Sequence, residues 1–116
     1  MTIKGEKRQA VYDKYSGHCA YCGKQIKYED MQVDHITPQR KYADKKIADR
    51  FENLNPSCRR CNHYKRSHDL DHFRGLLITL HKRIRKQYLN KVAEDYGIVE
   101  VKEWDGKFYF ERGGGA

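Results

Sequence analysis

Cys19-Ala20-Tyr21-Cys22 is the first of two Cys-x-x-Cys pairs in this chain of 116 residues, and Cys58-Arg59-Arg60-Cys61 is the second. Pairs with this spacing hold zinc through four thiolates, or form two disulfides in an oxidising compartment. The sequence shows no signal peptide and no apolar run long enough to span a membrane, which favours a reducing, cytoplasmic setting. We therefore expect one structural Zn²⁺ on the four cysteines.

The 35 residues 23–57 between the two pairs contain the segment Met31-Gln32-Val33-Asp34-His35-Ile36. Its apolar and β-branched residues predict a short strand that Pro38 ends. A neutral imidazole such as that of His35 accepts a proton near neutral pH, and a carboxylate such as that of Asp34 binds hard cations. Neighbours on a strand point to opposite faces, so these two residues can share a site only where the strand ends or bends.

The segments around this strand are predicted from local signals. A helix is expected over Glu6–Ser16, with Gly17 ending it in the left-handed conformation. The basic stretch Lys41–Phe51 is expected to be helical or irregular, and Asn53–Ser57 is expected to be a turn because Pro56 disfavours regular structure there. A short helix should then follow Cys61 and end near Arg66.

The C-terminal part predicts one long helix and a hairpin. Apolar residues recur at helical spacing from Asp69, a good helix cap, towards Gly97, with a break near Asn90. Beyond the helix, residues 99–103 and 107–111 alternate like strands around Asp105-Gly106, a dipeptide typical of tight hairpins.

The formal net charge of +8 indicates a polyanionic partner. Lys and Arg gather in four segments: Lys24–Lys27, Arg40–Lys46, Arg59–Arg66 and Lys82–Lys91. Phosphate backbones attract such surfaces without regard to sequence, which favours nucleic acid as the partner. A basic surface that is merely solvated is the competing interpretation.

Three motifs in order resemble the HNH endonucleases, which belong to the His-metal finger group: the first cysteine pair, Val-Asp-His-Ile-x-Pro at 33–38, and Asn-Leu-x-Pro-x-Cys-x-x-Cys-Asn-x-x-Lys at 53–65. The likeness covers about residues 8–73. Residues 62–67 also resemble the HNH domain of RNA-guided CRISPR nucleases, and the tail resembles small phage and prophage HNH proteins. The resemblance implies an α+β fold: a ββα-metal (His-Me) finger stapled by a zinc site of four cysteines, followed here by the long helix and the terminal hairpin.

The resemblance also implies roles for individual residues. His35 is the expected general base, Asn53 orients its loop, and Asn62 stands where the family name has its last histidine. Asp34 and Asn62 are expected to hold one catalytic Mg²⁺ or Mn²⁺, since carboxylate and amide oxygens suit hard cations. Asn62 could instead be a helix N-cap, because asparagine favours that position. The expected phosphate contacts are Arg59, Arg60, Lys65 and Arg66.

The sequence thus predicts a metal-dependent HNH endonuclease that hydrolyses DNA, bacterial or phage-encoded. We expect a single domain over residues 1–116, with its core at about 8–73, a helix and hairpin extension at 69–111, and a flexible tail at 112–116. The alternatives are a non-catalytic, zinc-stabilised module that binds nucleic acid, and a nuclease subunit of a phage terminase assembly. A homodimer, RNA as substrate, and nicking as against double-strand cleavage remain open at this stage.

Overall fold

The computed structural model describes residues 3–113, and these residues group into two compact units. The first unit contains residues up to 70 together with those from 108 onward, and the second contains residues 71–107. Residues 114–116 of the predicted flexible tail lie outside the described residues. The expectation of a single domain over the whole chain stays a prediction.

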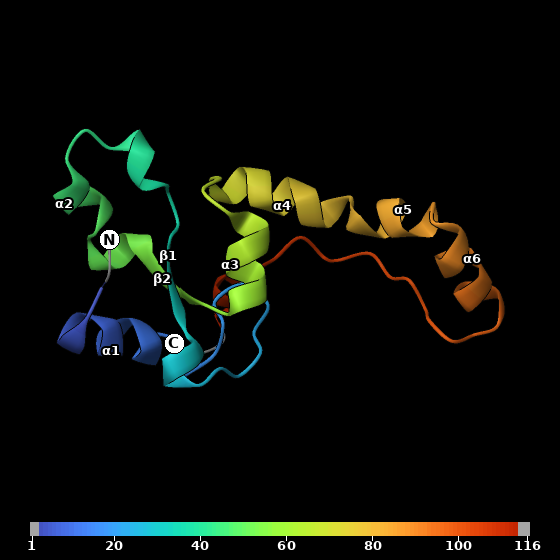
Figure 1. Cartoon of the computed structure of the whole chain (residues 1–116), viewed down its shortest axis with the longest axis horizontal. Helices are drawn as coiled ribbons and strands as arrows, with labels where there is room; N and C mark the ends of the chain where they lie inside the picture. The colour runs from blue at the N-terminus through green and yellow to red at the C-terminus, as the bar shows by residue number, and fades with distance from the viewer. Residues whose placement is uncertain (1–2, 114–116) are drawn as a thin grey trace. The chain divides into compact units, whose positions relative to one another are not determined.

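Within residues 3–113 the chain forms six α-helices and two strands (Figure 1). The helices are α1 (Gly5–Asp13), α2 (Lys45–Ala48), α3 (Arg59–Lys65), α4 (Leu70–Ile78), α5 (Leu80–Arg85) and α6 (Tyr88–Asp95). The strands are β1 (Gln32–His35) and β2 (Leu54–Ser57), and short 3-10 turns occupy Tyr28–Asp30, Gln39–Lys41, Phe51–Asn53 and Tyr109–Arg112. No described helix has both the length and the apolar character needed to cross a bilayer.

β1 and β2 form a two-stranded antiparallel ribbon at the centre of the first unit. The register pairs Gln32 with Ser57 at one end and His35 with Leu54 at the other. A ribbon of two four-residue strands is marginal by itself, so it depends on α1 and α3, which pack against it. The predicted α+β class and the predicted strand around Asp34 are confirmed.

The prediction of a turn over Asn53–Ser57 is wrong, because residues 54–57 are β2. The Pro56 carbonyl accepts a hydrogen bond from the Ala20 amide at 2.8 Å, so the backbone of Pro56 faces away from β1. Proline is tolerated in a strand at a position whose amide would face away from the ladder. Pro56 therefore costs the ribbon no hydrogen bond, and its partner across the strands is Val33.

Helix α1 and the turn behind it hold the N-terminal side of the ribbon. Gly17 has φ +78°, and a Cβ there would lie 2.9 Å from the Tyr12 hydroxyl oxygen, so glycine is required. The prediction of a left-handed Gly17 is confirmed, although α1 ends earlier than expected, at Asp13. The Arg8 guanidinium donates to the Met31 carbonyl at 2.9 Å and ties α1 to the start of β1.

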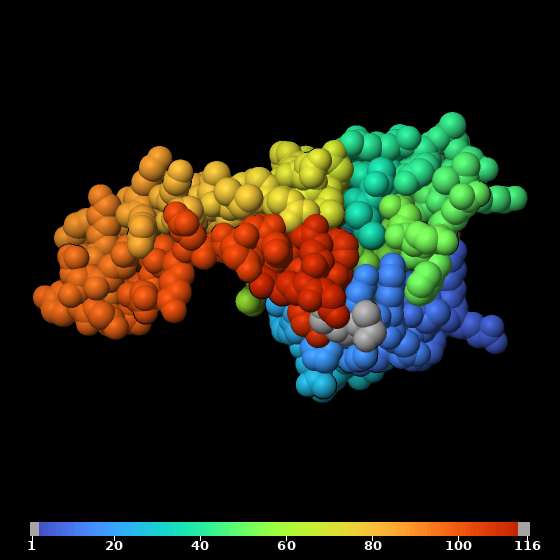
Figure 2. Space-filling model, turned by 180° about the vertical axis from the view of Figure 1, so that it is seen from behind, coloured from blue at the N-terminus to red at the C-terminus, as the bar shows by residue number. Residues whose placement is uncertain are grey.

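Residues 108–110 pack on the first cysteine pair and do not form the predicted hairpin (Figure 2). The Tyr109 and Phe110 amides donate to the Tyr21 and Ala20 carbonyls at 3.1 and 2.9 Å. Phe108 is buried with its ring edge-on to Tyr21, the ring centroids being 5.4 Å apart. Gly23 leaves room for Tyr109, since a Cβ there would lie 2.6 Å from the ring. The strand-like alternation of residues 107–111 serves this aromatic packing and not a strand pair.

The expected single long helix is three consecutive helices, α4, α5 and α6. The first interruption is at Thr79, whose hydroxyl donates back to the Gly75 carbonyl at 3.1 Å. Such a local bond competes with the helical ladder. The second interruption lies at residues 86–87, a few residues earlier than the predicted break near Asn90.

Candidate active site and metal centre

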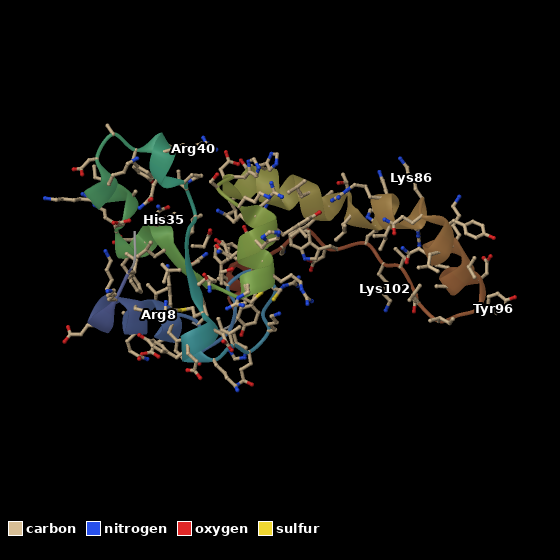
Figure 3. All side chains as sticks on the ribbon, in the orientation of Figure 1. Arg8, His35, Arg40, Lys86, Tyr96 and Lys102 are labelled. Atoms are coloured by element: carbon tan, nitrogen blue, oxygen red, sulfur yellow. The ribbon has the colours of Figure 1, made fainter. Side chains whose placement is uncertain are left out.

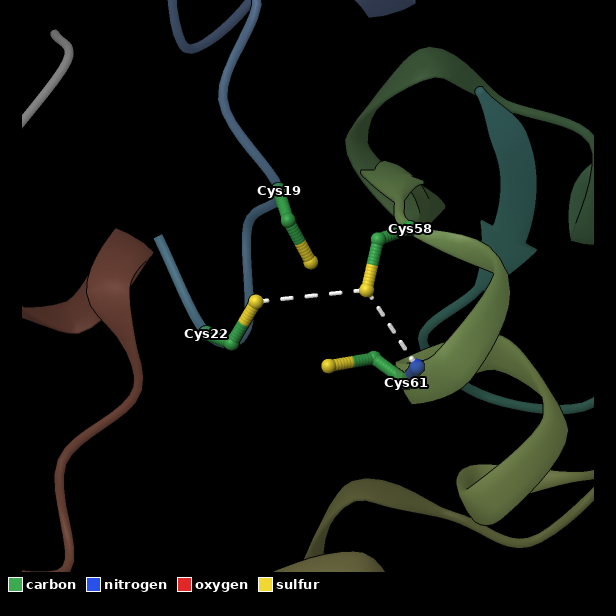
Figure 4. Close-up of side chains that lie close together, drawn as sticks. All are labelled: Cys19, Cys22, Cys58 and Cys61. Carbon is green, nitrogen blue, oxygen red and sulfur yellow. Dashed lines mark hydrogen bonds between the residues drawn. The ribbon is translucent and has the colours of Figure 1, made fainter. Parts of the chain in front are cut away.

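The four cysteines come together at one point of the first unit (Figure 4). Their sulfur atoms all lie within 4.8 Å of one another, and the Cys22 and Cys58 sulfurs are 3.9 Å apart. A tetrahedral zinc with Zn–S bonds of about 2.3 Å needs sulfurs roughly 3.8 Å apart. The arrangement therefore fits a closed, structural zinc site, and all four cysteines are free of disulfides.

Backbone and thiol hydrogen bonds hold the four cysteines together. The Cys61 amide donates to the Cys58 sulfur at 3.3 Å, which caps the start of α3. Hydrogen bonds from the thiols of Cys22 and Cys61 lower the pKa of Cys19, while the bond to Cys19 raises the pKa of Cys22 to about 11. Four thiols gathered at this spacing suit a soft divalent cation.

Asp34 lies in a buried polar cluster on the α3 side of the ribbon, with 5% of its surface exposed. The Tyr21 hydroxyl donates to Asp34 Oδ2, and Lys65 Nζ lies 3.1 Å from the same oxygen. Burial raises the pKa of Asp34, although the Lys65 ammonium and the Tyr21 hydroxyl oppose the rise. Lys65 also donates to the carbonyls of His35 and His68 at 3.0 and 2.8 Å.

The placement of Lys65 corrects its expected role as a phosphate contact. Its side chain is fully buried, and its three hydrogen-bonding directions are used inside the protein. A buried ammonium is tolerated only when it is paired and hydrogen-bonded, and Asp34 supplies that pairing. Lys65 therefore fastens α3 to β1 and does not reach a bound phosphate.

Lys65→Ala should destabilise the protein by about 3–5 kcal/mol, because it leaves the Asp34 carboxylate buried without its cation. Urea unfolding measures this change. The control is Lys41→Ala, which breaks the half-exposed ion pair to Asp69 (2.7 Å) and should cost no more than about 1 kcal/mol. Equal losses of unfolding free energy in the two variants would contradict the role of Lys65 in fastening α3 to β1.

The pH dependence of the Lys65→Ala variant follows from the same contact. Without the ammonium the pKa of Asp34 rises further, so the folded state holds a proton that the unfolded chain releases. The free energy of unfolding of the variant then falls as the pH rises from the pKa of Asp34 in the unfolded chain to its raised pKa in the folded state. At acidic pH the difference in stability between the variant and the unsubstituted protein therefore becomes smaller.

His35 ends β1, and its side chain leaves the ribbon on the other face (Figure 3). Its Nε2 lies 2.7 Å from Asp49 Oδ1, and 17% of the side chain is exposed. Asp49 is buried, and the Gln39 amide also donates to it at 3.2 Å. Burial acts to raise the pKa of Asp49, but the hydrogen bonds from His35 and Gln39 outweigh it and hold the pKa below its usual value. An ionised carboxylate can only accept, so Nε2 carries the hydrogen, and in the neutral imidazole Nδ1 is then the nitrogen with the lone pair.

Asn53 braces the loop that links His35 to Asp49. Its amide oxygen accepts from the Thr37 amide at 2.9 Å, and its NH2 group donates to the carbonyls of Thr37 and Ala48 at 3.0 and 2.8 Å. The two contacted residues directly precede Pro38 and Asp49. Asn53 therefore links the two ends of the 37–48 loop and so fixes the position of Asp49 next to the His35 imidazole.

Comparison with known proteins shows which family residues 19–72 match. Residues 19–72 match the family model of the HNH endonucleases. The match begins at the first cysteine of the zinc cluster and contains the ribbon, His35 and α3. The predicted resemblance is thus confirmed: the chain contains an HNH domain, and this supports a nuclease.

A solved structure similar to the chain is the Type II-C Cas9 enzyme from Actinomyces naeslundii, at 26% sequence identity and a TM-score of 0.52. The similarity covers 69% of this chain and 10% of that chain, so the protein spans about a tenth of the length of that Cas9. A search of curated proteins finds no match.

The remaining predicted residues of the HNH domain lie on α3 or directly after it. Cys58 is the N-cap of this helix, so Asn62 lies inside it and the alternative of Asn62 as a cap is excluded. Asn62 is partly exposed and precedes Lys65 by one turn, on the face of α3 that meets β1. Arg59, Arg60 and Arg66 are exposed, as expected of phosphate contacts.

Sequence reasoning missed Asp49 and Tyr21, the partners of the two central residues of the HNH motif. Asp49 follows a basic stretch in which Asp44 is an equally good candidate partner, and Asp44 instead caps α2 through the Lys46 amide at 2.9 Å. Tyr21 stands inside the first cysteine pair, where an aromatic residue indicates packing. The spacing of neither residue in the sequence signals its contact.

Proposed function

We propose that the protein is a metal-dependent endonuclease that hydrolyses phosphodiester bonds of DNA. The observation that carries this proposal is the His35–Asp49 pair at the end of the ribbon, which orients the imidazole through Nε2 and leaves Nδ1 outside the contact. The net charge of +8 supports a polyanionic substrate. The four clustered thiols support a cytoplasmic protein with structural zinc.

His35 acts as the general base of the proposed reaction. Its Nδ1 accepts a proton from water while the water oxygen bonds to phosphorus and the bond from phosphorus to the leaving 3′ oxygen breaks. Asp49 remains ionised and stabilises the imidazolium that results, and Asn53 holds the loop in place. Solvent water supplies the proton that the leaving 3′ oxygen takes up, which completes the step.

Asp34 and Asn62 are the residues that would hold Mg²⁺ or Mn²⁺ by their donor types, although Asp34 lies on the α3 face of the ribbon and the His35 side chain leaves on the other face. Tyr21 and Lys65 hold Oδ2 of Asp34, whereas Oδ1 has a single long contact of 3.4 Å to Lys65. Asn62 offers an amide oxygen from the neighbouring turn of α3, and both oxygens are hard donors. Such a cation would stabilise negative charge on the phosphate and on the leaving oxygen.

Cleavage of supercoiled plasmid tests the proposed function directly. We expect nicked product with Mg²⁺ or Mn²⁺ and none with EDTA, because one chain carries one His35 and cuts one strand at a time. Linear product that grows with the square of protein concentration would indicate a homodimer. Retention of binding with no cleavage under any divalent cation would favour the non-catalytic module instead, and activity that appears only with a terminase partner would favour the phage assembly.

Asp49→Asn should lower the rate of cleavage by about 10- to 100-fold, a part of what general-base catalysis contributes. Asparagine can present its NH2 group to Nε2 and so favours the wrong tautomer of His35. Asp44→Asn, the same change at an exposed helix cap, should leave the rate of cleavage unchanged. A cleavage rate of Asp49→Asn equal to that of Asp44→Asn would rule out this role.

A further inference from the structure

A basic hollow lies in the first unit, away from His35. Its volume is about 820 Å³. The segment before β1 forms one wall and the first turns of α3 form the other. The lining residues are Lys24, Gln25, Ile26, Lys27, Asp30, Cys58, Arg59, Arg60 and His63.

The charge of the hollow is strongly positive. Lys24, Lys27, Arg59 and Arg60 face a single carboxylate, Asp30. All four cations are exposed, and within residues 3–113 their side chains make no hydrogen bond or ion pair to the protein. Cations without internal partners remain available to an external anion, and clefts lined by one sign of charge focus that attraction.

The ribbon fixes the separation between the hollow and His35. His35 pairs with Leu54 at one end, whereas Asp30 and Cys58 in the hollow lie beyond the opposite end, next to the Gln32–Ser57 pair. At about 3.3 Å per strand residue, the edge of the hollow at Asp30 and Cys58 lies roughly 10–16 Å from His35 along the ribbon. A nucleic-acid strand advances about 3.4 Å per nucleotide, so this span corresponds to about three to five nucleotides.

We propose that this hollow binds the phosphate backbone of the substrate strand, about three to five nucleotides from the bond cut at His35. The proposal rests on the proposed function and deepens it, because it defines the length of substrate that the HNH domain grips. The lining offers Lys and Arg donors and, apart from His63, no ring on which a base could stack. Contacts of this kind position the strand without reading its sequence.

The first test measures binding and not cleavage. In a zinc-loaded His35→Ala protein, Lys24→Ala with Lys27→Ala should weaken binding of a fluorescent duplex about tenfold near 0.1 M salt and reduce the slope of log K against log salt by up to about 1.8. The control is Lys4→Ala with Lys102→Ala, which removes the same charge from exposed sites elsewhere. Equal effects of the two double variants would overturn the proposal.

A variant that should bind more tightly distinguishes a loss of phosphate contacts from a loss of affinity through misfolding. Asp30→Asn removes the single carboxylate of the hollow, so it should tighten binding by a few-fold and steepen the salt slope. Unfolding cannot produce a gain of affinity. Weaker or unchanged binding by Asp30→Asn would count against the hollow as the phosphate site.

Substrate length provides the last test and separates this proposal from the nuclease assignment. Affinity should rise when an oligonucleotide extends to about three to five nucleotides on one side of the cleaved bond, and the Lys24→Ala, Lys27→Ala variant should lose that gain. Cleavage without any effect of substrate length would contradict the hollow as a phosphate site but would agree with the nuclease assignment. An effect of length on binding, with no cleavage of any substrate, would contradict the nuclease assignment but would agree with the hollow as a phosphate site.

Discussion

His35→Ala should reduce phosphodiester cleavage by about 10²- to 10⁴-fold while nucleic-acid binding persists, as expected when a general base is removed. The imidazole contributes a proton-accepting nitrogen that nothing else described near Asp49 can supply, since Gln39 offers only an amide. Product formation from supercoiled plasmid under single-turnover conditions measures the chemical step, and anisotropy with a labelled duplex measures binding.

His72→Ala is the control for this experiment, because His72 is exposed and lies in the second unit, outside the ribbon and its loop. It should cleave at the rate of the unsubstituted protein. A melting curve shows whether His35→Ala remains folded, since Asp49 loses its closest partner. Cleavage by folded His35→Ala within a few-fold of the His72→Ala rate would end the assignment of His35 as base.

The residues that the sequence predicted well are those whose chemistry is local. The cysteine spacing is a pattern with few competing explanations, and the four sulfurs do converge. The strand around Asp34 was predictable because its β-branched residues and Pro38 mark it within a short stretch of chain. Gly17 was predictable because a helix end requires a left-handed residue.

The residues that the sequence predicted poorly depend on contacts between distant segments. Pro56 argued against a strand, yet its backbone faces Ala20, far earlier in the chain, and so sits in the ribbon at no cost. Residues 107–111 alternate as a strand would, but Tyr109 and Phe110 hydrogen-bond to the first cysteine pair. Lys65 belongs to a basic cluster and is nevertheless buried, because Asp34 lies beneath it. Local propensity carries no information about such partners.

Removal of zinc should unfold the first unit, because its regular structure is too small to stand alone. The ribbon has four residues in each strand, and the structural cysteines are fastened directly to it: Cys58 follows β2, and Tyr21 beside Cys22 binds Asp34. Structural zinc contributes on the order of 10 kcal/mol or more to the folding of small domains. That is comparable to the whole stability of most domains, at about 5–15 kcal/mol. Cys58→Ser, or treatment with a zinc-selective chelator, should therefore abolish the cooperative melting transition and with it all cleavage.

The metals can be separated by adding them back, since the chain has no cysteine outside the cluster to serve as a matched variant. Zinc at one equivalent should restore the melting transition without restoring cleavage, and Mg²⁺ added afterwards should restore cleavage. Mg²⁺ alone should restore neither, because thiolates bind it poorly. A chelated protein whose four thiols react freely with a thiol reagent, yet melts at the same temperature as before, would show that the sulfur cluster does not hold the ribbon together. In that case the placement of His35 would need a different physical cause, with Lys65 and Asp34 as the remaining link between α3 and β1.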